Sequence, residues 1–143
     1  MAEVVKDILE VKNREVWTIG PDATVYDSIS LMADKKVGAL IITEGDKVLG
    51  IITERDYIRK VILQGKASKN ISVSEIMTAR VIYVQPDQKI EECMALMSEK
   101  NIRHLPVLEE DKLVGVISIR DVVKALISEK QFVIDQLTNY ISS

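Results

Sequence analysis

The chain carries nearly the same seven residues twice, GIITERD at positions 50–56 and GVISIRD at positions 115–121. Laying Val16–Lys60 over Val81–Ala125 without a gap gives 14 identities in 45 positions. The two copies lie 65 residues apart and account for most of the 143 residues. A chain with this internal repetition is expected to fold as two similar structural units.

Each copy predicts the element order β-α-β-β-α. The runs VWTI and VIYV are typical of short strands, and each stops near a proline, which cannot extend a central strand. The next segment is helical, with Thr24 and Asp27 spaced as a capping box. Its expected apolar face carries Val25, Ile29, Met32 and Ala33, and that of the second copy Ile90, Cys93, Met94 and Met97.

Two strands and a second helix complete each copy. The strands GALIIT and KVLGIIT are joined by E-G-D, and HLPVLE and KLVGVIS by E-E-D, which suits a tight hairpin. The second helix is expected to begin at Arg55 or Asp56, and in the second copy at Arg120 or Asp121. The sequence therefore predicts an α/β (α+β) fold in which the apolar faces of two sheets pack together.

Composition narrows the class of protein. Hydrophobic residues make up 47% and charged residues 29% of the chain, as in ordinary globular domains. A net charge of −3 provides no general attraction to nucleic acid or to an anionic membrane. The single cysteine excludes an internal disulfide, and the first residues lack the pattern of a secretory signal. We therefore expect a soluble, cytoplasmic protein.

The repeated seven residues have two interpretations. Thr53 or Ser118 can be a helix N-cap with an aspartate beside the positive helix end, which is a purely structural role. Against this, a capping box prefers Glu or Gln, because Asp is short for the reach. Gly50 and Gly115 also suggest a backbone that a ligand approaches closely. A carboxylate at a helix N-terminus suits the hydroxyls and phosphate of a ribonucleoside phosphate.

The paired motif G-h-h-[TS]-x-x-D, with h apolar, and IRHLPV before the second hairpin resemble the CBS domain pair, or Bateman module. The resemblance implies CBS domains at 4–63 and 73–128, a linker at 64–72 and a helical tail at 129–143. It also implies pseudo-twofold packing of the sheets, adenosine-containing ligands (AMP, ADP, ATP, NAD or S-adenosylmethionine) and a homodimer. Family members are mostly regulatory, without catalysis of their own, so an unknown target protein is implied as well.

The same resemblance assigns candidate ligand-binding residues in each copy. In the first copy, Thr53 and Asp56 bind the ribose of the ligand. The other contacts to the ligand come from Thr18, Val37, Gly38 and Ala39. In the second copy, Ser118 and Asp121 bind the ribose. The residues that line the base-binding position are Ile102, Arg103, His104 and Pro106. Tyr83 stands where the family pattern has threonine, so its ring either fills the cleft or stacks on a base.

The resemblance also implies that basic side chains contact phosphate, with a hydrogen-bonded, partly buried side chain as the alternative for His104. Arg103 and His104 replace Gly38 and Ala39 of the first copy, and this asymmetry fits one anion shared by both copies. Arg55 and Arg120 either aid the same contact or lie in solvent at a helix start.

The remaining features of the sequence say less about its function. Cys93 is expected in the core, and one histidine with one cysteine provides neither a metal site nor a catalytic triad, so we expect no enzyme. Lysines near the linker leave nucleic-acid binding as an alternative that salt dependence would test. A ligand-free dimerisation scaffold is a further alternative. After the second copy, Leu126, Val133, Leu137 and Ile141 form an apolar stripe on one helix, which suits a dimer contact.

Overall fold

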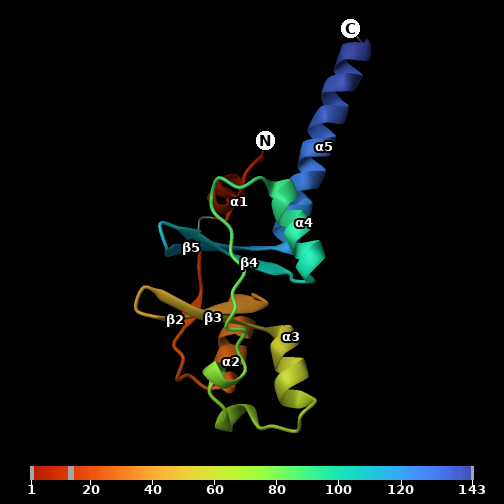
Figure 1. Ribbon diagram of the computed structural model, residues 1–143. Helices are drawn as coiled ribbons and strands as arrows, with labels where there is room; N and C mark the ends of the chain where they lie inside the picture. The colour runs from red at the N-terminus through yellow and green to blue at the C-terminus, as the bar shows by residue number, and fades with distance from the viewer. Residues whose placement is uncertain (1, 13–14, 143) are drawn as a thin grey trace. The chain divides into compact units, whose positions relative to one another are not determined.

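The computed structural model describes residues 2–12 and 15–142 (Figure 1). The first copy comprises β1 (Thr18–Ile19), α2 (Val25–Lys35), β2 (Ala39–Glu44), β3 (Lys47–Thr53) and α3 (Glu54–Tyr57), which continues as the π-helical η1 (Ile58–Ile62). The second comprises α4 (Ile90–Lys100), β4 (His104–Glu109), β5 (Lys112–Ser118) and α5 (Ile119–Ser142). α1 (Val5–Val11) precedes the first copy, and the 3-10 turns η2 (Ser68–Asn70) and η3 (Val73–Glu75) precede the second. The predicted α+β fold is confirmed.

The chain forms two compact units, and these do not follow its order. One unit is Trp17–Ile82; the other combines the residues up to Val16 with Tyr83–Ser143. Each unit therefore joins the sheet and helices of one copy to the segment that precedes the other copy. The boundaries 4–63, 64–72, 73–128 and 129–143 are read from the sequence repeat and stay a prediction.

The unit Trp17–Ile82 contains a three-stranded sheet in the order β1-β2-β3. β1 runs parallel to β2, and β2 pairs antiparallel with β3 from Ala39↔Thr53 to Glu44↔Lys47. Backbone hydrogen bonds between Ile51 and Thr78 in both directions attach the segment after η3 to β3. The core cluster of this unit is Val25, Met32, Leu40, Ile42, Ile52, Val61, Val73 and Ile76.

In the other unit, β4 and β5 form a two-stranded antiparallel sheet from His104↔Ser118 to Glu109↔Lys112. Val84 adds one parallel bridge to Val107. The Val5 backbone N–H donates to the Gln88 carbonyl over 2.9 Å, which ties α1 to the segment before α4. The buried side chains of this unit include Val5, Leu9, Ile90, Cys93, Met97, Leu105, Ile117 and Val122.

The structure corrects several predicted details. VWTI yields only the strand Thr18–Ile19, and VIYV only the Val84 bridge, so in each run the pairing begins later than predicted. The second helices begin at Glu54 and Ile119, one residue before the earliest predicted starts. On α2, Val25 and Met32 are buried as expected, but Ala33 is exposed and Ser28 is buried in its place. The Ser28 hydroxyl donates to the Val25 carbonyl over 2.6 Å, which satisfies its polar group.

Both hairpins are as tight as predicted. The left-handed conformations that such turns need are supplied by Gly45 in the first, and by Glu110 and Asp111 in the second. None of the helices in the described ranges combines the length and the apolar character that crossing a bilayer requires.

Candidate functional site

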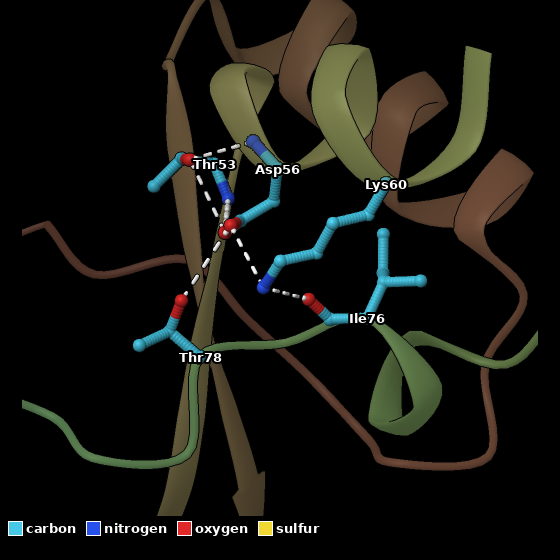
Figure 2. Close-up of polar contacts among 5 residues, drawn as sticks. All are labelled: Thr53, Asp56, Lys60, Ile76 and Thr78. Atoms are coloured by element: carbon cyan, nitrogen blue, oxygen red, sulfur yellow. Dashed lines mark hydrogen bonds and ion pairs between the residues drawn. The ribbon is translucent and has the colours of Figure 1, made fainter. Parts of the chain in front are cut away.

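The first candidate site lies where β3 becomes α3 (Figure 2). The Asp56 backbone N–H donates to Thr53 Oγ1 over 3.1 Å, and the Thr53 backbone N–H donates to Asp56 Oδ2 over 3.0 Å. The Thr53 hydroxyl also donates to the same carboxylate oxygen over 3.2 Å. These bonds form a reciprocal capping box that fixes the Asp56 side chain at the positive end of the helix.

Two further side chains contact the same carboxylate. Lys60, one helical turn after Asp56, places Nζ 3.3 Å from Oδ1 and also donates to the Ile76 carbonyl over 3.0 Å. The Thr78 hydroxyl donates to Oδ1 over 3.5 Å. Figure 2 shows the Thr53, Lys60 and Thr78 side chains converging on Asp56. The Asp56 side chain is 13% exposed, so its carboxylate is held inside the unit by internal partners.

The second candidate site repeats the arrangement where β5 becomes α5. The Ser118 backbone N–H donates to Asp121 Oδ2 over 2.8 Å, and the Asp121 backbone N–H donates to Ser118 Oγ over 3.2 Å. Lys12, at the end of α1, places Nζ 2.8 Å from Asp121 Oδ2 and donates to the Val116 carbonyl over 2.9 Å. Burial raises the pKa of Asp121, but hydrogen bonds from Lys12 and Ser118 outweigh it and hold that pKa below its ordinary value.

The expectation that aspartate is too short for a reciprocal capping box is wrong. Asp56 and Asp121 both reach the N-cap backbone N–H, at 3.0 and 2.8 Å. Asp27 makes the same contact with Thr24 over 3.3 Å at the start of α2. The N-cap residue is extended in both boxes that begin with threonine, which brings its N–H toward the third helical residue. Capping thus accounts for the hydroxyl and the aspartate of the repeated seven residues.

The repeated glycines also have an internal explanation, which corrects their assignment to a ligand. A Cβ on Gly50 would lie 2.7 Å from Met77 Sδ and 2.8 Å from the Thr78 carbonyl oxygen. A Cβ on Gly115 would overlap Leu9 Cδ2. In each unit, the segment that precedes the other copy packs directly over the glycine. The glycine is therefore repeated because the same close packing is repeated.

The structure brings the predicted base-lining residues next to these carboxylates. Ala39 pairs with Thr53 across the hairpin, and the Glu54 backbone N–H donates to the Gly38 carbonyl over 3.1 Å. In the other unit, His104 pairs with Ser118, and the Ile119 backbone N–H donates to the Arg103 carbonyl over 2.8 Å. Each unit therefore groups a hydroxyl, a carboxylate and the backbone of a strand start at one helix N-terminus. Val37 and Ile102 lie immediately before these strand starts and are half-buried.

The model of the CBS domain matches residues 5–63 and 73–128. The chain belongs to the CBS domain family.

Curated and solved CBS proteins resemble this CBS pair over most of its length. The CBS domain-containing protein CBSX3, mitochondrial, of Arabidopsis thaliana is 38% identical over 96% of this chain and 71% of its own length. A protein with CBS domains from Burkholderia ambifaria MC40-6 is 52% identical, with a TM-score of 0.84 over 87% of this chain and 94% of its own. The CBS-domain containing protein ATU1752 from Agrobacterium tumefaciens is 44% identical, with a TM-score of 0.83 over 87% and 94%.

His104 lies inside the second candidate site of the CBS pair. Burial lowers the pKa of His104, Lys12 and Arg103 lower it further, and Asp121 acts in the opposite direction. These surroundings therefore disfavour the charged form of the imidazole. The Arg103 side chain is exposed.

The other predicted residues lie farther from the carboxylates or at the surface. Thr18 is exposed in β1, where it pairs with Ile41. Tyr83 is 49% exposed beside the Val84 bridge, and Pro106 is buried within β4. Arg55 and Arg120 occupy the first turns of α3 and α5, with Arg55 half-buried and Arg120 exposed.

Sequence reasoning missed the residues that neutralise the aspartates. Lys60 follows Asp56 by four residues, a spacing that signals a helical ion pair. Lys12 is 109 residues from Asp121, and no local pattern connects the two. Cys93 is fully buried as predicted, and burial raises the pKa of its thiol to about 11. Among the described residues, no group of three or more His, Cys, Asp or Glu side chains could hold a metal ion.

Proposed function

We propose that this CBS pair binds adenine nucleotides and regulates a separate partner protein. CBS pairs are generally regulatory, nucleotide-binding modules and are generally not enzymes. The ligand classes are AMP, ADP, ATP, NAD and S-adenosylmethionine, which share the adenosine that the family recognises. We also propose that the protein acts in the cytoplasm as a homodimer and has no catalytic activity.

The grouping at the two helix N-termini carries this proposal. Asp56 and Asp121 are held partly buried, each beside a hydroxyl side chain and a strand start. A fixed carboxylate can accept hydrogen bonds from both hydroxyls of a ribose. The backbone around Gly38 and Arg103 offers hydrogen-bonding groups for the edge of a base. We assign Thr53 and Asp56 to one ribose and Ser118 and Asp121 to a second.

Regulation requires that the ligand bind two arrangements of the protein with different affinity. In the second site, Lys12 joins Asp121 to the end of α1. A ribose on Asp121 would compete with that ammonium group and so change how α1 is held. In the first site the cation comes from the same helical segment, because Asp56 is paired with Lys60.

A ligand-free dimerisation scaffold is the second candidate function. It is favoured by the internal contacts of both carboxylates, since Asp56 and Asp121 already accept hydrogen bonds within their own units. For a scaffold, these contacts would be sufficient to explain the repeated seven residues.

Isothermal titration calorimetry with the five adenosine compounds separates the two functions. The regulatory proposal expects heat of binding with at least one compound below millimolar concentration. Mass spectrometry of small molecules released from the purified protein identifies which compound it carries. No heat with any compound at millimolar concentration would support the scaffold. Unchanged ATP after a long incubation would support the absence of catalysis.

A further inference from the structure

The C-terminal half of α5 is exposed to solvent. α5 runs on past α4 to the C-terminal end (Figure 1). Each described residue from Gln131 to Ser142 is exposed, including Ile134, Leu137 and Ile141. A helix of about 12 residues is marginally stable in water by itself, so an exposed apolar helix end of this length indicates a surface that another molecule covers.

Accessible apolar side chains of α5 gather on one face of the helix. At about 100° per residue, the set named below falls within an arc of about 120°. We call this set the α5 stripe: Val123, Leu126, Ile127, Val133, Ile134, Leu137 and Ile141. Each of these is exposed except Leu126, which is half-buried. At about 1.5 Å per residue the stripe is about 27 Å long, so it fits the apolar face of one partner helix of similar length.

A groove at the base of the α5 stripe adds charged groups to this surface. Its volume is about 520 Å³. The residues that line it are Glu91 of α4 and, from α5, Leu126, Glu129, Lys130, Val133 and Ile134. Within the part of the chain that the structure describes, neither Glu91 nor Glu129 forms an ion pair. The groove therefore presents two carboxylates without a cationic partner next to aliphatic side chains.

These carboxylates restrict what can cover the groove. Glu129 is already half-buried, and an occupant would remove more water from its carboxylate. Burying a carboxylate is unfavourable unless a cation pairs with it. Lys130 is exposed and has a long stem, so its ammonium group can stay in water at the edge. Two carboxylates and one ammonium group also leave an excess of negative charge. The occupant therefore has to bring Arg or Lys side chains beside its own apolar face.

Two other occupants match this surface less well. A second copy of the chain would bring the same excess of negative charge to a twofold contact, and like charges disfavour such a contact. Helices that lie on anionic membranes are rich in Lys and Arg. From Gln131 to Ser142, α5 carries one charged side chain, Asp135, and no Lys or Arg. Both comparisons favour a protein segment of positive charge.

We propose that the α5 stripe and its groove bind an amphipathic helix of the regulated partner protein, whose Arg or Lys side chains pair with Glu91 and Glu129. This inference rests on the proposed function, because it supplies the surface through which the partner is regulated. α5 begins at the second candidate site, where Ser118 and Asp121 cap it, and continues unbroken into the stripe. One helix therefore connects the proposed ligand site to the docking surface.

Two fluorescein-labelled helical peptides of about 18 residues, the length of the stripe, test this chemistry. Both carry leucine at helical spacing along one face. The basic peptide has arginines along both edges of that face, and the acidic peptide has glutamates at the same positions. Fluorescence anisotropy measures their binding to the full chain without nucleotide. The dissociation constant of the basic peptide should be lower than that of the acidic peptide by about 10-fold or more.

Variants of the chain locate the binding surface. Leu137→Asp places a charge in the α5 stripe and should weaken the basic peptide by about 10-fold or more. Its matched control, Asn139→Asp, adds the same charge on the opposite face of the same turn and should change binding by less than about 2-fold.

Charge reversal tests the pairing with the groove. Glu129→Lys should weaken the basic peptide by about 3–10-fold and should strengthen the acidic peptide, because attraction and repulsion are exchanged. Its matched control is Asp135→Lys, which reverses an exposed charge on the face of α5 away from the stripe. This control should change the affinity of either peptide by less than about 2-fold.

Several results would overturn the proposal. Equal affinity for the two peptides, or unchanged binding to Leu137→Asp, would exclude a basic helix on this surface. In sedimentation velocity, an assembly of the wild-type chain that Leu137→Asp dissociates would assign the stripe to a second copy. Flotation with anionic lipid vesicles that Leu137→Asp abolishes would assign it to a membrane.

The outcome for docking is separable from the outcome for the proposed function. Nucleotide binding is measured by calorimetry in the absence of peptide. Heat of nucleotide binding in a chain that binds neither peptide would overturn the docking surface and leave the nucleotide proposal intact. Peptide binding in a chain that gives no heat with any adenosine compound would support docking and count against the proposed regulation by nucleotides.

Discussion

Lys12 and Asp121 form an ion pair of 2.8 Å that joins the end of α1 to the start of α5. The two residues are 109 positions apart, yet both belong to the same compact unit. In the other unit the corresponding carboxylate, Asp56, is paired at 3.3 Å with Lys60 of its own helical segment. The two repeats therefore hold equivalent carboxylates with cations from different parts of the chain.

Replacing Lys12 with Met should make the free energy of unfolding less dependent on pH in acid. The folded pKa of Asp121 lies below its ordinary value of 3.8. The ion pair thus stabilises the fold above pH 3.8, and this stabilisation is lost as the pH falls through the folded pKa. Because the Lys12 side chain is 35% exposed, we expect only about 0.5–1 kcal/mol at pH 7. Urea unfolding at pH 7 and pH 3 measures the change.

Lys124→Met is the matched control, because it removes the same charge from an exposed position on α5. It should leave the pH dependence as in wild type. In carbon-13 NMR titrations, the Asp121 carboxyl group should titrate at a higher pH in Lys12→Met than in wild type. An unchanged titration midpoint would show that the ion pair does not form in solution.

Lys12→Met should also strengthen the binding of adenosine at the second site. Under the proposed function, a ribose must replace the Lys12 ammonium at Asp121. Removing a partly exposed competitor should lower the dissociation constant for adenosine by about 2–5-fold. Calorimetry with adenosine and with AMP measures this effect, and Lys60→Met gives the comparison at the first site. Weaker AMP binding with unchanged adenosine binding would instead identify Lys12 as a phosphate contact.

Asp56→Asn should weaken nucleotide binding at the first site by about 1–3 kcal/mol, the range for a lost charged hydrogen bond. Asp27→Asn provides the control, since Thr24 and Asp27 form the same capping box at α2 and have no assigned ligand. Asp56→Asn should cost more stability in urea than Asp27→Asn, because Asp56 also pairs with Lys60, and only Asp56→Asn should lose affinity. Equal affinity for Asp56→Asn and wild type would remove the ribose assignment and leave the capping role.

The order of helices and strands could be predicted from the sequence because its signals are local. The hairpin turns at Gly45 and Glu110 and the apolar face of α2 each depend on neighbouring residues, and the 65-residue repeat presents the same local patterns twice. The pairing of the run VIYV could not be predicted well, because one bridge at Val84 replaces the expected strand. A short apolar run does not reveal how many of its residues find a partner strand.

The interior of the candidate sites could not be predicted, because it depends on contacts between distant segments. Leu9 packs on Gly115, and Lys12 pairs with Asp121, although α1 lies at the start of the chain. The sequence offers no signal that α1 belongs with the second repeat. A glycine required by a neighbouring chain segment also has the same sequence signature as a glycine required by a ligand. The interpretation of Gly50 and Gly115 therefore needed the structure.

Substituting the repeated glycines with alanine should destabilise the units by different amounts. At Gly50 the new Cβ meets the Thr78 backbone carbonyl at 2.8 Å, and β3 would have to separate from the segment that it pairs with. At Gly115 the obstacle is Leu9 Cδ2, the end of a side chain that can change rotamer. We expect losses of about 2–3 kcal/mol for Gly50→Ala and about 1 kcal/mol for Gly115→Ala.

Gly20→Ala is the control for this pair, because a Cβ at Gly20 meets no atom within 4 Å. Its free energy of unfolding in urea should stay within about 0.5 kcal/mol of wild type. Leu9→Ala should relieve the Gly115→Ala substitution but not Gly50→Ala, since only Gly115 lies under Leu9. A double-mutant cycle measures this coupling. If Gly115→Ala is as stable as wild type while nucleotide affinity falls, the second glycine serves a ligand after all, and the packing explanation fails there.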